Sequence, residues 1–167
     1  MSFFKTVEKR RSIRSFSDKT VEKSKVQKIL KAVWMCPSAK GSQNFQVLIV
    51  KDPKKKESLV KATFNQEYVN AKTVLVFCSD PKRIKFMGSR GKNLLSVQDA
   101  TIGAAYAQLA ATAVGLSSVW IGHFNEKEVA AILKTKLRPI AILPIGHANE
   151  KPAPKKNLKM KDLFKHV

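Results

Sequence analysis

An alanine-rich run, DATIGAAYAQLAATAVGL at residues 99–116, limits the possible folds more than any other segment of this chain. Alanine has the highest helix propensity, and Gly115 stands where a left-handed glycine often ends a helix. The run therefore predicts one long helix. Because its side chains are small, other elements can approach its backbone closely. We expect this helix at the centre of the domain or at a subunit interface.

Two short apolar runs predict buried strands. FQVLIV, at residues 45–50, is rich in β-branched residues, and TVLVFCS, at residues 73–79, repeats the pattern. An Asp-Pro pair follows each run and indicates a turn. The same patterns predict further elements, namely helices over residues 21–34 and 126–134 and strands over residues 117–122 and 140–146.

The segment 82–97 is basic, contains glycine and has weak periodicity, so it is either a mobile loop or a short helix over the core, and such a segment can act as a lid. The C-terminal tail is basic, with prolines, before a short amphipathic end. Strands and helices alternate irregularly over one compact length. The sequence predicts a single α+β layered domain spanning residues 1–167.

Composition narrows the function classes. With 167 residues, 44% of them hydrophobic, the chain can build one core. Its net charge of +20 suits a nucleic-acid-binding protein, a protein that handles anionic small molecules, or a soluble protein with a lysine-rich surface. The lysines are scattered along the chain, which favours a solvated surface over a groove for a polyanion.

The cysteines and histidines indicate no metal site. Cys36 and Cys78 lie in apolar surroundings without a CxxC or Cys/His ligand spacing, so we expect buried free thiols in a reducing compartment. The histidines are expected to be structural or exposed. The N-terminus lacks a secretory signal, and no apolar run approaches the roughly 20 residues of a membrane span. We therefore expect a cytoplasmic, soluble protein.

The arginines are concentrated in one segment, whereas the lysines are scattered along the chain. Of the six arginines, three fall in VEKRRSIRSF at residues 7–16. A guanidinium group grips phosphate or carboxylate with two parallel hydrogen bonds. In an extended segment, Arg10, Ser12 and Arg14 project to one face and line one anion, whereas Arg11 turns away. A phosphate site and a solvated basic stretch both remain open at this point.

Five segments, in content and order, resemble the FMN-dependent nitroreductase family over nearly the whole chain. They are EKRRSIRSF, CPSAKGSQNFQVLIV, NQEYVNAKTVLVFCSD, DATIGAAYAQLAATAVGLSSVWIG and LPIGHANEKPAPKKNL. The resemblance implies a nitroreductase-like layered fold with a central, mostly antiparallel sheet flanked by helices. It also implies an intertwined homodimer with FMN at the subunit interface.

The resemblance assigns the arginine cluster to FMN. Arg10 and Ser12, with Arg11 beside them, would bind the phosphate and ribityl side, and Arg14 would approach the pyrimidine edge. A fixed cation there stabilises the negative charge of the reduced flavin, so Arg14 would tune the flavin. The basic positions that return to the phosphate are Lys155 and Lys156, where the family more often has arginine.

Two further segments are implied in contact with the flavin. One is the PSAKGSQ loop, which reaches it from the neighbouring subunit; the other is a stretch whose backbone lies along the isoalloxazine ring. The family often has asparagine where Gly41 stands and Pro-Trp where Asn44-Phe45 stand. The implied contact residues are Pro37, Ser38, Ala39 and Gln43 in the loop, and Trp120, Ile121 and Gly122 in the stretch.

The implied activity is that of an FMN-dependent NAD(P)H oxidoreductase with a ping-pong mechanism. NADH or NADPH would pass hydride to the flavin, and a nitroaromatic, quinone or flavin acceptor would then take two electrons. Most of this chemistry belongs to the cofactor, which accounts for the lack of a catalytic triad or paired carboxylates. The alternatives are another reaction on the same fold and FMN, flavin binding without turnover, and a nucleic-acid-binding protein without flavin.

Overall fold

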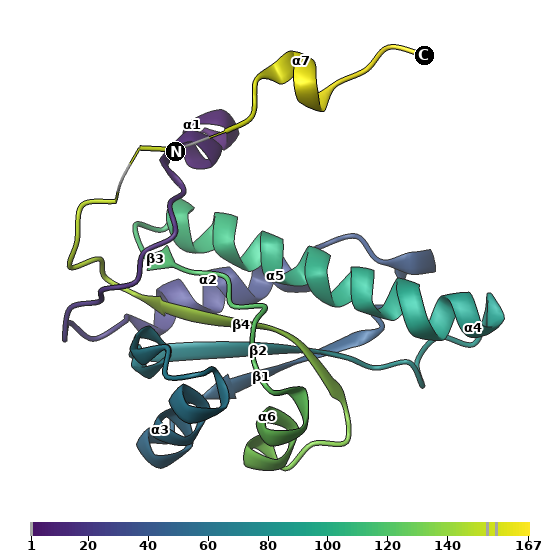
Figure 1. Ribbon diagram of the computed structural model, residues 1–167, viewed down its shortest axis with the longest axis horizontal. Helices are drawn as coiled ribbons and strands as arrows, with labels where there is room; N and C mark the ends of the chain where they lie inside the picture. The colour runs from purple at the N-terminus through teal and green to yellow at the C-terminus, as the bar shows by residue number, and fades with distance from the viewer. Residues whose placement is uncertain (1, 153, 156) are drawn as a thin grey trace.

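A four-stranded antiparallel sheet forms the centre of the computed structural model, which describes residues 2–152, 154–155 and 157–167 (Figure 1). This sheet confirms the expected α+β fold with an antiparallel centre. The strand order is β1-β2-β4-β3, from β1 (Phe45–Val50), β2 (Thr73–Ser79), β4 (Arg138–Gly146) and β3 (Ser117–Ser118).

Helices cover both faces of the sheet, so the domain has three layers (Figure 1). The alternation along β2 explains this arrangement: Leu75 and Phe77 pack on one helical layer, and Val74 and Val76 pack on the other. Every residue of β2 is buried, as its uninterrupted apolar run predicts. The first layer holds α2 (Lys23–Trp34) and α5 (Ser96–Ala113), and the second holds α3 (Pro53–Ala62) and α6 (Glu126–Leu133).

Helix α5 lies across the sheet at the centre of the first layer, as the alanine-rich run predicts. Its inward residues include Ala100, Ala104 and Ala107, all fully buried. At Gly103 a β-carbon would lie 3.1 Å from the ring of Phe45, so the helix backbone approaches the sheet closely. The small residues of α5 thus place the helix directly against β1 and β2.

The strand predicted over residues 117–122 is wrong beyond its first two residues. Ser117 and Ser118 pair with β4, and after them only Ile121 makes a single bridge, to Ile142. Trp120 packs toward the α2–α5 layer and Ile121 is buried in the other layer. The chain is turning here toward the start of α6, so the ladder cannot continue.

Two helices, α3 and α1 (Phe3–Lys9), were not predicted from the sequence, because the residues at which they begin are also typical of a turn or of a chain terminus. Asp52 accepts a hydrogen bond from the Lys54 amide at 2.9 Å, and Pro53 occupies the first turn, so this Asp-Pro pair starts α3. The Ser2 side chain likewise caps the start of α1.

The segment 82–97 contains the short helices α4 (Gly88–Arg90) and η3 (Gly91–Leu95), which run directly into α5.

Helix α1 and the beginning of the C-terminal tail lie together outside the layered body (Figure 1). The Lys155 ammonium donates a 2.7 Å hydrogen bond to the Val7 carbonyl, which ties the C-terminal tail to α1. Beyond this point α7 (Met160–Leu163) extends away from the body (Figure 1). Both ends expose large apolar side chains, including Phe3, Phe4, Met160 and Phe164. Within the described residues, every helix is too short or too polar to cross a membrane.

Candidate functional site

The arginine cluster lines a cavity of about 360 Å³ where the N-terminal segment meets the C-terminal tail. Backbone contacts hold the segment extended. The Ile13 amide donates to the Ser118 carbonyl at 3.1 Å, and the Asn149 amide donates to the Ser15 carbonyl at 2.9 Å. We call this space the arginine cavity; its lining residues are Arg10, Arg11, Ser12, Arg14, Pro152, Lys155 and Asn157.

Arg11 does not turn away from the cavity, contrary to the expectation from strand alternation. Arg10 is still the C-terminal cap of α1, with its amide bonded to the Thr6 carbonyl, so the segment is not a regular strand at this point. The Nη1 atom of Arg11 is buried and has no hydrogen-bond acceptor among the described residues. A buried, unpaired guanidinium nitrogen is costly unless a ligand supplies the acceptor.

The electrostatics of the arginine cavity favour an anion. Burial and the neighbouring charges of Arg10 and Arg11 lower the pKa of Lys155, and Glu8 offsets part of this effect. Glu150 is nearby, but its carboxylate accepts the backbone amide of Arg14. Cationic side chains and a serine hydroxyl thus converge on one space, which suits the phosphate group of FMN.

A second cavity, of about 510 Å³, lies under the PSAKGSQ loop. We call it the loop cavity; its lining residues are Pro37, Ser38, Ala39, Leu95, Gln98, Asp99, Thr101 and Ile102. Its lining is largely apolar, with one buried carboxylate. Such a surface suits a flat aromatic ligand that needs only a few polar contacts.

Asp99 anchors this loop and was not predicted as a site residue. It is 2% exposed, and its carboxylate accepts hydrogen bonds from the Ala39 amide at 3.0 Å and from Asn44 Nδ2 at 2.8 Å. Asn44, one of the departures from the family pattern, is fully buried against it. A lone acidic residue inside an alanine-rich helix was the signal available in the sequence.

Gln43 shapes the turn and does not line the loop cavity. Its backbone is left-handed, with a φ of 46°, and its amide donates to Ser38 Oγ at 2.9 Å. Its side-chain nitrogen donates to the Trp34 carbonyl at 2.6 Å, at the end of α2.

The remaining predicted site residues stand apart from both cavities in the described chain. Trp120 and Ile121 pack into the two core layers, and Gly122 is exposed beside Trp120. Lys156 lies outside the described residues. The structure therefore brings together Arg10, Arg11, Ser12, Arg14 and Lys155 at one place, and Pro37, Ser38 and Ala39 at another.

The two cavities lie toward opposite ends of α5. Ala39 is bonded to Asp99 near the start of the helix, and Ser12 pairs with Ser118, just beyond its end. With a rise of 1.5 Å per residue, the helix separates these points by roughly 20 Å. A single chain therefore holds the two cavities apart.

Neither thiol is set up for chemistry. Both cysteines are buried and free, and burial raises the pKa of Cys78 to about 12. Burial, with the nearby charge of Asp99, also raises the pKa of Cys36. Because the thiolate is the reactive form, both side chains act as packing groups.

Among the described residues, no group of His, Cys, Asp and Glu could hold a metal ion.

Known proteins match both the sequence and the fold. The sequence profile of the Nitroreductase family matches residues 7–73 and 64–147. A putative NADH dehydrogenase/NAD(P)H nitroreductase of Archaeoglobus fulgidus is 34% identical over 80% of this chain and 74% of its own length. The FMN reductase [NAD(P)H] of Bacillus subtilis is 29% identical over 92% of this chain and 69% of its own.

Solved structures match the fold of this chain over nearly its whole length. NfrA2 of B. megaterium superimposes with a TM-score of 0.91 and 26% identity, covering 99% of this chain and 74% of that one. The NADPH:FMN oxidoreductase of Vibrio harveyi, solved with NAD+, gives a TM-score of 0.90 and 26% identity, covering 98% and 76%. The profile match and the common fold together show that this chain belongs to the nitroreductase family.

Proposed function

We propose that this protein is an FMN-dependent NAD(P)H oxidoreductase. The observation that carries the proposal is the arginine cavity, whose lining brings three arginines, Lys155 and the Ser12 hydroxyl together. One nitrogen of Arg11, Nη1, is buried and has no acceptor among the described residues. The relatives named as NAD(P)H nitroreductase and FMN reductase support the same activity. FMN, when bound, supplies the transfer of two electrons from NAD(P)H to a nitroaromatic, quinone or flavin acceptor.

The residues of the arginine cavity would have two roles in binding FMN, according to their positions. Arg10, Arg11, Ser12 and Lys155 would hold the phosphate, because they line the cavity and the buried Nη1 of Arg11 has no acceptor in the part of the chain that the structure describes. Arg14 is exposed at the rim, held through its backbone amide by Glu150. Its guanidinium is thus free to stand beside the flavin ring and stabilise negative charge there.

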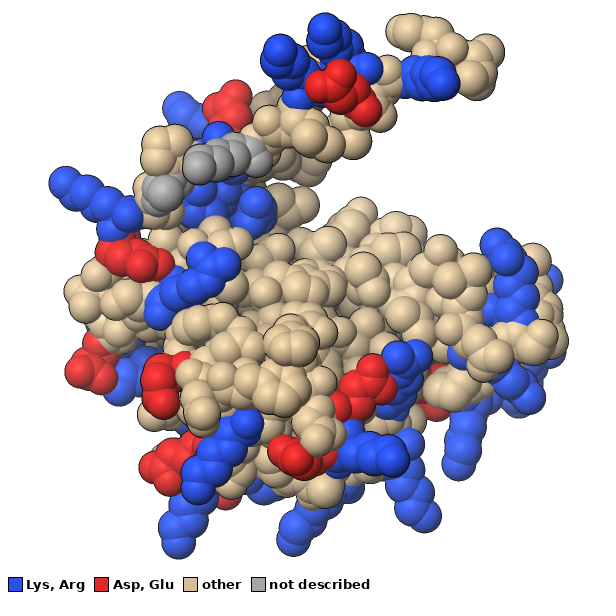
Figure 2. All heavy atoms as spheres, in the orientation of Figure 1, with Lys and Arg blue, Asp and Glu red and all other residues tan. Residues whose placement is uncertain are grey.

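The functional unit we propose is a homodimer. Each FMN site would combine the arginine cavity of one subunit with the loop cavity of its partner, since α5 holds these half-sites roughly 20 Å apart within one chain. The outward face of α5 is available for the interface: Thr101, Ala105, Tyr106 and Ala113 are exposed there. Figure 2 shows few lysines and arginines across the middle of the molecule, where α5 lies in Figure 1.

The first test is the absorption spectrum of the protein after addition of FMN and dialysis, followed by NADH or NADPH without oxygen. Retained flavin bands that bleach with the nucleotide are expected. A protein that keeps no flavin would overturn the proposal.

Substitution of Arg11 tests the phosphate assignment. Arg11→Ala should weaken FMN binding by about 2 kcal/mol, or roughly 30-fold, because a charge-assisted hydrogen bond is lost. Arg138→Ala is the matched control, since Arg138 pairs with Glu126 at 2.8 Å on the surface and should leave FMN affinity unchanged. Equal FMN affinity in Arg11→Ala and the unmodified protein would show that Arg11 does not hold the phosphate.

A further inference from the structure

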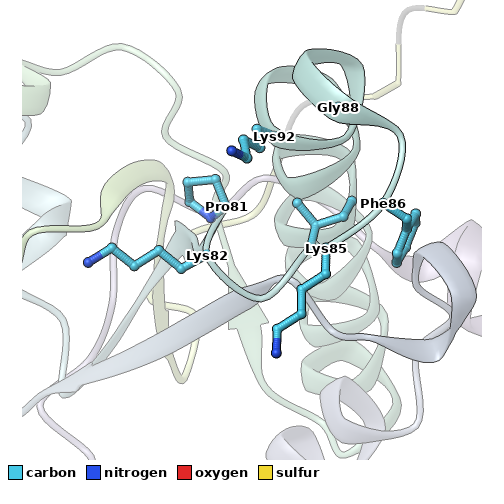
Figure 3. Close-up of a pocket in the computed structure, with 7 residues that line it drawn as sticks. Pro81, Lys82, Lys85, Phe86, Gly88 and Lys92 are labelled. Atoms are coloured by element: carbon cyan, nitrogen blue, oxygen red, sulfur yellow. The ribbon is translucent and has the colours of Figure 1, made fainter.

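A third cavity, of about 520 Å³, lies in the basic segment between β2 and α5 (Figure 3). Lys82 and Lys85 project from the loop that follows β2, and Lys92 comes from the helical turn after it. We call this space the lysine cavity; its lining residues are Pro81, Lys82, Ile84, Lys85, Phe86, Gly88 and Lys92.

The lysines of this cavity carry uncompensated charge. Residues 81–98 contain no acidic side chain. Asp80, just before them, pairs with Arg83 at 3.0 Å. Among the described residues, Lys82, Lys85 and Lys92 form no salt bridge. In Figure 3 Lys92 lies close to Pro81, and the side chains of Lys82 and Lys85 extend from the lining in different directions. Three lysines in one lining give this region a positive charge, which attracts a ligand with several negative charges.

The rest of the lining is apolar and partly rigid. Ile84 is 2% exposed, and Pro81 and Phe86 complete the lining. At Gly91 a β-carbon would lie 2.4 Å from the Phe86 carbonyl, so the loop and the helical turn pack tightly against each other. The cavity therefore suits a ligand that joins flat apolar groups to anionic ones, as a nucleotide does.

The lysine cavity adjoins the loop cavity. The Lys40 ammonium stands 4.8 Å from the centroid of the Phe86 ring, and Lys40 directly follows Ala39. On the other side, η3 carries both Lys92 of the lysine cavity and Leu95 of the loop cavity. A ligand that reaches from the flavin along this surface would meet the lysines next.

We propose that the lysine cavity binds the phosphate groups of NAD(P)H while the nicotinamide lies at the flavin. The inference rests on the proposed function, because it needs the flavin at the loop cavity. Lysine suits this task, since its ammonium is a compact charge on a flexible stem and imposes no fixed fork on a substrate that must leave. NADH and NADPH share a diphosphate, and NADPH adds a 2′-phosphate.

The test compares two triple variants of equal charge. In one, Lys82, Lys85 and Lys92 are changed to glutamine; in the control, the exposed residues Lys54, Lys127 and Lys136 are changed to glutamine. Isothermal calorimetry on the oxidised, FMN-loaded protein gives Kd for NADP+ and NAD+, and steady-state kinetics give KM for NADPH and NADH. The site variant should bind NADP+ about tenfold more weakly, with a matching rise in KM for NADPH.

The results distinguish binding of the 2′-phosphate, which only NADPH has, from binding of the diphosphate, which NADH and NADPH share. A larger loss for the NADPH series assigns the lysines to the 2′-phosphate, and an equal loss for both series assigns them to the diphosphate. In the control variant Kd and KM should stay at the values of the unmodified protein. Unchanged Kd and KM in the site variant, or equal losses in the two triple variants, would overturn the inference.

Failure of this inference is distinguishable from failure of the proposed function. The flavin absorption of the unmodified protein decides the proposed function before any nucleotide is added. A site variant that keeps its affinity for FMN and for the nucleotides would contradict only the inference about the lysines, and the proposed function would stand. A single Lys92→Gln variant repeats the comparison with the smallest change to the fold, and an unaltered circular dichroism spectrum confirms folding.

Discussion

Asp99 shows how one side chain can set the shape of a loop that lines a cavity. Its carboxylate is buried, yet it accepts hydrogen bonds from the backbone of Ala39 and from both the backbone and the side chain of Asn44. These acceptors satisfy donors that the loop would otherwise bury without partners. The loop is thus held by α5 through a residue 60 positions away in the chain.

Replacing this carboxylate should loosen the loop. In Asp99→Asn one acceptor oxygen becomes a donor facing other donors, which should lower the free energy of unfolding by about 1–3 kcal/mol. FMN affinity should fall as well, because in the proposed dimer the loop supplies one half of the FMN site. Urea denaturation and FMN titration measure the two effects.

Asp52→Asn is the matched control for this prediction. It makes the same chemical change at an exposed helix cap, where aspartate and asparagine are equally good, so stability should hardly change. If Asp99→Asn behaved like this control in both measurements, Asp99 would not anchor the loop.

At the scale of the element, the position of α5 depends on small residues on its inward face. Gly103 faces Phe45 and Phe77, and a β-carbon there would lie 3.1 Å from the first ring and 3.5 Å from the second. Both rings are buried and enclosed, so they have little room to move. The position of α5 between the arginine cavity and the loop cavity depends on this contact.

A larger residue at Gly103 should therefore push the helix off the sheet. Gly103→Val should lower the free energy of unfolding by about 2–3 kcal/mol through overpacking, even though glycine is the poorer helix former. Ala131→Val, on the exposed side of α6, should cost only about 0.5 kcal/mol of helix propensity. Urea denaturation checks both, and equal effects would contradict close packing at Gly103.

At the scale of the whole molecule, charge is distributed unevenly. The chain carries a net charge of +20, yet residues 94–121 contain no lysine or arginine. The outward face of α5 belongs to this stretch, and Figure 2 shows it as a band with few charges. Like-charged lysines elsewhere keep copies apart, so this band is where two copies can approach.

A charge placed on this band should break the proposed dimer. Tyr106 is 39% exposed near the middle of the outward face, and Tyr106→Lys should give a monomer that no longer retains FMN. Light scattering after gel filtration measures the mass, and absorption measures the flavin. Phe64→Lys changes another exposed aromatic residue, away from α5, and should remain a dimer. A dimeric Tyr106→Lys protein with bound FMN would place the interface elsewhere.

Some of the fold could be predicted because local patterns were unambiguous. The strands at Phe45–Val50 and Thr73–Ser79 appear with the predicted bounds, since both are continuous apolar runs ended by a helix cap or turn. The start of α3 was hidden because an Asp-Pro pair is equally typical of a turn and of a helix N-terminus. Residues 119–122 look like strand but bridge the two core layers.

The sequence by itself determined the composition of the site: arginines concentrated before a layered domain, and a small-residue helix that had to be central. Only the tertiary structure decided that Arg11 lines the arginine cavity, that Asp99 holds the loop and that the two cavities are held apart within one chain. The physical reason is that helix and strand patterns depend on near neighbours along the chain. These three features depend on packing and hydrogen bonds between residues far apart in sequence, which no local pattern encodes.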